Sequence, residues 1–182
     1  MTKWEKYAII KDTMDTQLDI MTIEQESTPL SEKTCVFTGH RQLGEDFSAR
    51  KLKKQIRLLM QEGVEIFFNG MAMGCDLLAA EYVLQLKKEF PSVKLVACVP
   101  CYGQEKYFPQ HDQRRYVKIL KKADETVVLS DHYFNGCMQK RDLYMAERAD
   151  VMIAYCNKKE GGAAYTVKCF QKTHPNGRIF FI

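Results

Sequence analysis

The sequence lacks several features that define large classes of proteins. No apolar run approaches the ~18 residues of a membrane-spanning helix, and Met1–Ile10 lacks the apolar core of a signal peptide. We therefore expect a cytoplasmic protein without membrane contact. A hydrophobic content of 46% is too high for a disordered chain, and 182 residues fit one domain with a short appendage.

The sequence also lacks a large excess of charge of one sign. Lys and Arg number 27 against 23 Asp and Glu, which leaves a formal net charge of +4. An excess this small does not indicate any particular class of partner.

The seven cysteines do not form the pattern of a secreted disulfide scaffold or of a complete metal site. Their number is odd, and several lie within apolar runs. Cys98 and Cys101 form one C-x-x-C pair, but no second pair and no matching histidines complete four ligands. A metal or redox role is the minor alternative, and we expect reduced, buried thiols with no metal and no cofactor.

Two segments with different composition divide the chain. Residues 1–32 are polar and end in a loop-like stretch, Glu26–Ser31, so we expect an N-terminal extension. Residues 33–182 alternate short apolar runs with helix-period segments and form the predicted domain. The predicted strands are Thr34–Thr38, Val64–Phe68, Val93–Val99, Thr126–Leu129, Val151–Tyr155 and Arg178–Ile182.

The segments between these strands have the periodicity of amphipathic helices. One example is Leu52, Ile56 and Leu59, which share a helix face that ends before Gly63. Repeated strand–helix alternation, with strands apolar on both faces, predicts an α/β fold: a Rossmann-like, doubly wound, mainly parallel sheet of about six strands between two helix layers. Ligands of such folds lie beyond the carboxyl ends of the strands.

The loop after the first predicted strand contains Gly39, His40 and Arg41. A glycine lets backbone approach a ligand, an arginine binds phosphate or carboxylate, and a histidine donates a hydrogen bond or a proton. Further along the chain, Tyr102 follows the third strand and is a candidate for stacking on a base. Arg141 is a further candidate anion ligand, although a single basic residue on a helix is often only solvated.

The loop after the second predicted strand holds Gly70 and Gly74, and Asp76 stands near the start of the next helix. This pattern is neither G-x-G-x-x-G nor a P-loop. It is typical of a strand-to-helix loop that holds a ligand. Because Asp is also a favoured helix N-cap, a purely capping role for Asp76 is the alternative.

The loop after the fifth predicted strand is the most specific local signal. Gly161 and Gly162 enter a helix that continues with two alanines and then Thr166. Small residues at a helix start let a phosphate approach the unpaired N–H groups there. We therefore expect this segment to hold a phosphate.

Taken together and in order, these motifs resemble the YpsA-like branch of the SLOG superfamily over about Lys33 to Ile182. The segments that carry the resemblance are Phe37–Arg41, Asn69–Glu81, Pro100–Tyr102 with Gln104 and Glu105, Arg141 with Tyr144 and Met145, and Gly161–Lys168. The resemblance implies a Rossmann-type domain that binds a nucleotide or a nucleotide-derived small molecule, as a sensor or regulatory module.

Two other activities occur in that superfamily. LOG-like members are phosphoribohydrolases with a P-G-G-x-G-T-x-x-E loop, whereas this chain lacks the proline, has Ala164 at the next glycine and has no acid up to Lys168. Asp76 and Glu81 are then the candidate catalytic carboxylates. DprA-like members bind single-stranded DNA, which makes nucleic acid the third alternative. A second copy of the chain, in a homo-oligomer, is a further alternative partner.

Overall fold

The computed structural model describes residues 33–182, so the predicted extension 1–32 lies outside the described residues. The strands are β1 (Thr34–Gly39), β2 (Ile66–Asn69), β3 (Lys94–Val99), β4 (Glu125–Val128), β5 (Val151–Tyr155) and β6 (Arg178–Phe181). The helices are α1 (Ala49–Gln61), α2 (Cys75–Leu86), α3 (Gln110–Leu120), α4 (Cys137–Ala146) and α5 (Gly162–Thr173), with a 3-10 turn η1 at Gln104–Tyr107. Every predicted strand and helix is present, with small shifts at the ends.

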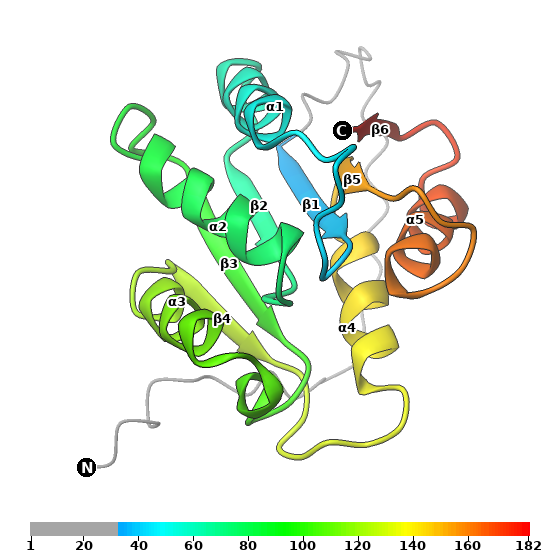
Figure 1. Cartoon of the computed structure of the whole chain (residues 1–182). Helices are drawn as coiled ribbons and strands as arrows, with labels where there is room; N and C mark the ends of the chain where they lie inside the picture. The colour runs from blue at the N-terminus through cyan, green and yellow to red at the C-terminus, as the bar shows by residue number, and fades with distance from the viewer. Residues whose placement is uncertain (1–32) are drawn as a thin grey trace, which may run out of the picture.

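All neighbouring strands pair in parallel, in the order β4-β3-β2-β1-β5-β6 (Figure 1). The chain builds outward from β1 to β4 and then returns to place β5 on the other side of β1. This reversal between β1 and β5 is where a doubly wound sheet binds its ligand. The predicted Rossmann-like, three-layer α/β architecture is therefore confirmed.

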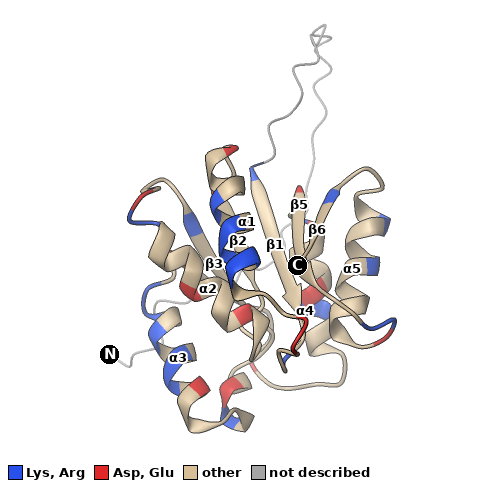
Figure 2. Cartoon of the chain, turned by 45° about the horizontal axis from the view of Figure 1, so that its top comes forward, with Lys and Arg blue, Asp and Glu red and all other residues tan. Residues whose placement is uncertain are grey.

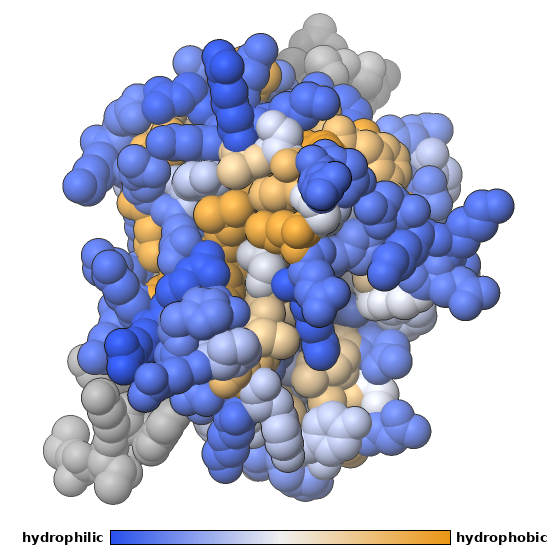
Figure 3. Space-filling model, in the orientation of Figure 1, coloured by the Kyte–Doolittle hydropathy of each residue, from blue (hydrophilic) through white to orange (hydrophobic). Residues whose placement is uncertain are grey.

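Alternate side chains of each strand pack into two separate apolar cores, because successive residues of a strand point to opposite faces. Phe37 faces the core formed with α1, α2 and α3, and its neighbour Val36 faces the core formed with α4 and α5. Figure 3 shows a largely hydrophilic outer surface with apolar residues gathered in the middle of this face. Among the described residues, no helix is both long and apolar enough to cross a membrane.

Local sequence signals place the ends of α1. The Ser48 hydroxyl caps the helix by accepting a hydrogen bond of 3.2 Å from the Lys51 N–H. Leu52, Ile56 and Leu59 are fully buried on its inner face, as their spacing predicts. The helix ends just before Gly63, whose φ of 95° suits a glycine.

Candidate functional site

Three adjoining cavities open at the carboxyl ends of the strands, and we call them together the crevice. An inner cavity of about 240 Å³ lies between β1 and the starts of α2, α4 and α5. An outer cavity of about 870 Å³ lies beside the loops after β1 and β5, and a connecting cavity of about 90 Å³ lies between α2 and η1. Arg41 lines all three cavities, so the crevice is continuous around this side chain.

Three helices point their N-terminal ends at the inner cavity. Asp76 from the first turn of α2, Met138 from the first turn of α4, and Gly162 with Ala163 at the start of α5 all line it. The first N–H groups of a helix have no acceptor within the helix, and this end carries a partial positive charge. The inner cavity therefore suits an anionic group.

The start of α5 presents backbone rather than side chains to the inner cavity. Gly161 has a φ of 100°, which is a glycine conformation, and it precedes the first helical residue, Gly162. A Cβ atom added at Gly162 would meet nothing within 4 Å, so the space over this residue is open. Thr166 lines the same cavity, but its hydroxyl already donates to the Gly162 carbonyl at 2.9 Å.

The loops after β1 and β2 pack directly on each other. A Cβ atom at Gly39 would lie 2.5 Å from the Cβ atom of Cys75, and one at Gly74 would meet the carbonyl of His40 at 2.6 Å. The Cys75 N–H donates to this same carbonyl at 3.2 Å. Gly39 and Gly74 thus permit the contact between the loops, which in turn places Arg41 at the centre of the crevice.

His40 belongs to a hydrogen-bonded network at the edge of the outer cavity. Its Nε2 atom accepts a bond of 3.2 Å from the Asn157 N–H, an arrangement that a neutral ring with its proton on Nδ1 satisfies. The Tyr155 hydroxyl and the Asn157 amide donate to Asp46 at 2.6 and 2.8 Å, and these bonds lower the pKa of Asp46. The network holds the loop that follows β5 against the loop that follows β1.

Asp76 is buried and is among the residues that line the inner cavity. The N-cap of α2 is Gly74, so the alternative of a purely capping role for Asp76 is wrong: it is the second helical residue. Its Oδ2 atom accepts a bond of 3.3 Å from the Ala72 N–H, and its Oδ1 atom has no hydrogen-bond partner among the described residues. A buried oxygen without a partner is costly, which makes Oδ1 a natural contact for a ligand.

Burial raises the pKa of Asp76 to about 7. The guanidinium of Arg141 opposes this rise, whereas the carboxylate of Asp142 adds to it. Near neutral pH a substantial share of Asp76 is therefore protonated, and a protonated carboxyl group donates a hydrogen bond.

Arg141 is a buried residue rather than a solvated one. Its Nε atom donates to the Asp142 carboxylate at 2.7 Å, and its Nη1 atom donates to the Gly70 carbonyl. Both Arg141 and Asp142 line the inner cavity. The bond to the Gly70 carbonyl ties α4 to the loop after β2, and the ion pair of Arg141 and Asp142 lies close to Asp76.

This packing leads to a prediction for Gly70. A Cβ atom at this position would lie 2.8 Å from both the Cζ atom of Arg141 and the Oδ2 atom of Asp76. We expect Gly70→Ala to displace the guanidinium and to lower the free energy of unfolding by about 1–3 kcal/mol, the usual cost of overpacking. Urea unfolding measures the change, and Gly162→Ala, where space is open, is the control that should stay near the wild-type value. Equal stability of the two variants would contradict the packing described here.

Glu81 does not reach the crevice. Its carboxylate accepts two bonds of 2.9 Å from Arg115 of α3, which also donates to Asp112 at 2.7 Å. These partners raise the pKa of Arg115 above its ordinary value, with the Glu81 bond as the largest cause. Glu81 therefore belongs to the contact between α2 and α3, and it does not line the crevice in which a catalytic carboxylate is expected.

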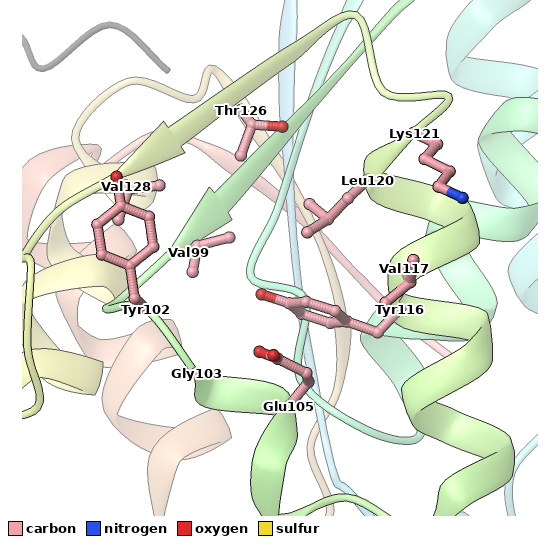
Figure 4. Close-up of a pocket in the computed structure, with 10 residues that line it drawn as sticks. All are labelled: Val99, Tyr102, Gly103, Glu105, Tyr116, Val117, Leu120, Lys121, Thr126 and Val128. Carbon is pink, nitrogen blue, oxygen red and sulfur yellow. The ribbon is translucent and has the colours of Figure 1, made fainter. Parts of the chain in front are cut away.

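Tyr102 does not lie in the crevice, where the sequence predicts that it stacks on a base. It lines a separate, mostly apolar cavity of about 280 Å³ between α3 and the edge strand β4, together with Val99, Val128 and Leu120 (Figure 4). Tyr102 is not among the residues that line the crevice. The loop after β3 turns away from the sheet reversal, and η1 separates its first residues from the crevice.

Cysteines contribute packing rather than reactive groups at the site. Among the described residues all seven are free thiols, and Cys75, which precedes Asp76 in the chain, is buried. Burial raises the pKa of the Cys75 thiol well above its usual range. No cluster of three or more His, Cys, Asp or Glu side chains suited to a metal ion occurs within residues 33–182.

Sequence reasoning missed three polar residues that shape the crevice. Asn69 is fully buried; its side chain accepts from the Met71 N–H and donates to the Asp76 carbonyl, both at 2.8 Å. Gln104 reaches from η1 to the Met71 carbonyl at 2.6 Å, and Asp142 holds Arg141. Asn69 could have been identified as a site residue, because it is a polar residue at the end of an apolar strand. The position of Asp142 within a helix gives no comparable indication that it lines the crevice.

Comparison with known proteins supplies relatives of the whole domain. Residues 35–181 match the sequence model of the YpsA family, described as the YspA SLOG family. A UPF0398 protein of Halalkalibacterium halodurans is 28% identical over 137 residues, which cover 74% of this chain and 72% of that protein. A UPF0398 protein of Staphylococcus epidermidis is 31% identical over 122 residues, covering 65% of this chain and 63% of that one, so the chain spans less than two thirds of the staphylococcal protein.

Solved structures of DNA processing protein A share the fold. The protein from Helicobacter pylori, described for its single-stranded DNA binding mode, superposes with a TM-score of 0.62 at 18% identity, covering 83% of this chain and 65% of that one. The Streptococcus pneumoniae protein gives 0.58 at 19% identity, covering 78% and 48%. At such identities the likeness concerns the fold alone. Since the family match extends over nearly all of the described residues, the chain belongs to the YpsA family of SLOG proteins.

Proposed function

We propose that this protein binds a nucleotide or a nucleotide-derived small molecule in the crevice, as a sensor or regulatory module. The phosphate lies in the inner cavity over Gly162 and Ala163, and Arg41 lies alongside it. The observation that carries the proposal is buried Asp76, whose Oδ1 atom has no hydrogen-bond partner within residues 33–182, at a cavity onto which three helix N-termini converge. Helix dipoles and Arg141 favour an anion, and Asp76 supplies a further polar contact.

The chemistry of the inner cavity favours binding over hydrolysis. In this proposal Asp76 is neutral in a good part of the molecules at pH 7, because burial raises its pKa to about 7. A neutral carboxyl group gives less stabilisation to a developing positive charge on a ribose than an ionised one. The second candidate carboxylate, that of Glu81, is already paired with the guanidinium of Arg115.

Single-stranded DNA binding is the second candidate function, favoured by the fold shared with DNA processing protein A. The charge distribution gives it little support. In Figure 2 the Lys and Arg residues lie on several separate elements, α1, α3 and α5 among them, and Asp and Glu lie elsewhere in the same view, so that no single continuous basic face is seen. Binding of single-stranded DNA generally needs a basic groove with aromatic side chains on which the bases stack.

A panel of nucleoside 5′-monophosphates tests these functions. We expect at least one to raise the thermal unfolding temperature without release of free base, which chromatography of the incubation mixture detects. Release of the base would instead establish N-glycosidic hydrolysis. A single-stranded oligonucleotide that binds with a steep salt dependence, while no mononucleotide binds, would favour the nucleic-acid function.

A further inference from the structure

The inner cavity is too small to hold a whole nucleotide. Ligand sites usually measure ~300–1,000 Å³, and the inner cavity measures about 240 Å³. The connecting and outer cavities continue from it on the far side of Arg41. A ligand with its phosphate over Gly162 must therefore extend past Arg41 into this second space.

One aromatic side chain lies at the part of the crevice that such a ligand would reach beyond Arg41. Tyr107, the last residue of η1, lines both the connecting and the outer cavity. The residue is 90% exposed, which makes it the most exposed of the large hydrophobic residues in the described part of the chain. Met73 lines the same two cavities and adds apolar surface to them.

Buried residues on both sides hold Tyr107 in place. Gln104 is anchored to the Met71 carbonyl at 2.6 Å, and the buried Phe108 packs edge-on against Tyr116 with ring centroids 5.8 Å apart. The Phe108 N–H also donates to the Glu105 carbonyl at 2.9 Å. The backbone of Tyr107 is therefore held while its ring remains in solvent, so stacking of a planar group has to order only the side-chain torsions of this residue.

We propose that Tyr107 is the stacking surface for the base of the ligand, which lies across Arg41 with its phosphate in the inner cavity and its base in the outer one. This inference rests on the proposed function and names the ligand class more closely: a 5′-phosphorylated nucleoside whose base faces solvent on one side. Tyr107 thus takes the base-stacking role that the sequence predicts for Tyr102. Stacking tolerates any base, because each base has an aromatic face.

The test compares ribose 5-phosphate with the four common nucleoside 5′-monophosphates by calorimetry on the full chain. We expect Tyr107→Ala to weaken the binding of those nucleotides that bind by about 5- to 150-fold, the range that alanine substitution of a stacking aromatic produces. Tyr107→Phe should keep the affinity, since it keeps the ring. Ribose 5-phosphate should bind the wild type and Tyr107→Ala equally.

Tyr133→Ala is the matched control. Tyr133 is also an exposed tyrosine, at 67%, but it is not among the residues that line the crevice. Nucleotide binding that responds to Gly162→Leu but not to Tyr107→Ala would overturn the stacking role and leave the proposed function standing. Equal losses for ribose 5-phosphate and nucleotides in Tyr107→Ala would also overturn it. If none of the phosphorylated compounds binds the wild type, both proposals fail.

Discussion

Replacing Gly162 with leucine is expected to weaken the binding of phosphorylated ligands by at least about 100-fold, a loss of roughly 2.7 kcal/mol. The leucine side chain would fill the open space over the first turn of α5, where the phosphate is proposed to lie. The fold should survive, because a Cβ atom at Gly162 meets nothing within 4 Å and the residue is not held in a left-handed conformation. Calorimetry measures the affinity, and urea unfolding checks the fold.

Two further variants make this test specific. Gly162→Ala should give an intermediate loss of affinity, because a methyl group fills only part of the space. Gln110→Leu places the same side chain on the first residue of α3, which is exposed and lies outside the crevice, and it should bind as the wild type does. Undiminished affinity in Gly162→Leu would disprove the position of the phosphate.

Replacing Asp76 with asparagine is expected to stabilise the protein at pH 8. The pKa of this carboxyl group rises from 3.8 to about 7 on folding because of burial. A raised carboxyl pKa means that the folded state resists ionisation, so its stability relative to the variant falls as pH increases from about 4 to about 7. At pH 8 the full difference is present, on the order of 4 kcal/mol. Urea unfolding of both proteins at pH 5 and pH 8 measures it.

The same substitution should remove part of the pH dependence of ligand binding. A protonated Asp76 donates to a phosphate oxygen, whereas an ionised Asp76 repels the phosphate. With a pKa near 7, about one molecule in eleven is protonated at pH 8, which weakens binding about tenfold relative to low pH. Asp76→Asn keeps a donor at every pH, so we expect its affinity to exceed that of the wild type at pH 8.

The ratio of the two dissociation constants is the relevant quantity, because titration of the phosphate itself affects both proteins alike. A ratio that stays constant between pH 5 and pH 8 would show that Asp76 does not exchange a proton near the ligand. A wild type that binds better than the variant at pH 8 would indicate instead an ionised Asp76 that accepts hydrogen bonds from the ligand.

Much of the fold could be predicted because its signals are local. Strand segments such as Val151–Tyr155 are apolar on both faces, and helix faces such as that of Leu52 and Ile56 repeat with the helical period. Hydrophobic periodicity and capping residues act over a few neighbouring positions, so a single sequence displays them. The same holds for Gly161 and Gly162, whose place at a helix start follows from the strand that precedes them.

The candidate site was predicted less completely, since its side chains find their partners across the fold. Arg141 looks like a surface residue in the sequence, but Asp142 and the Gly70 carbonyl enclose it. Glu81 is paired with Arg115 of another helix, and Tyr102 belongs to a different cavity. Asp142 is the next residue in the chain, but the Gly70 carbonyl and Arg115 lie 71 and 34 positions away from their partners, outside the local window that sequence patterns cover.

The sequence by itself determined the strand–helix alternation, the parallel sheet and the loops that meet at its carboxyl edge, because these depend on local periodicity and small residues. Only the tertiary structure decided which polar groups remain without partners. Gly74 takes the N-cap position of α2, and the Oδ1 atom of Asp76, one of the residues that line the crevice, has no hydrogen-bond partner in the described part of the chain. Tyr107 stands at the outer cavity because its neighbours Gln104 and Phe108 are buried. Desolvation and pairing are properties of the packed molecule, and they set the chemistry of the site.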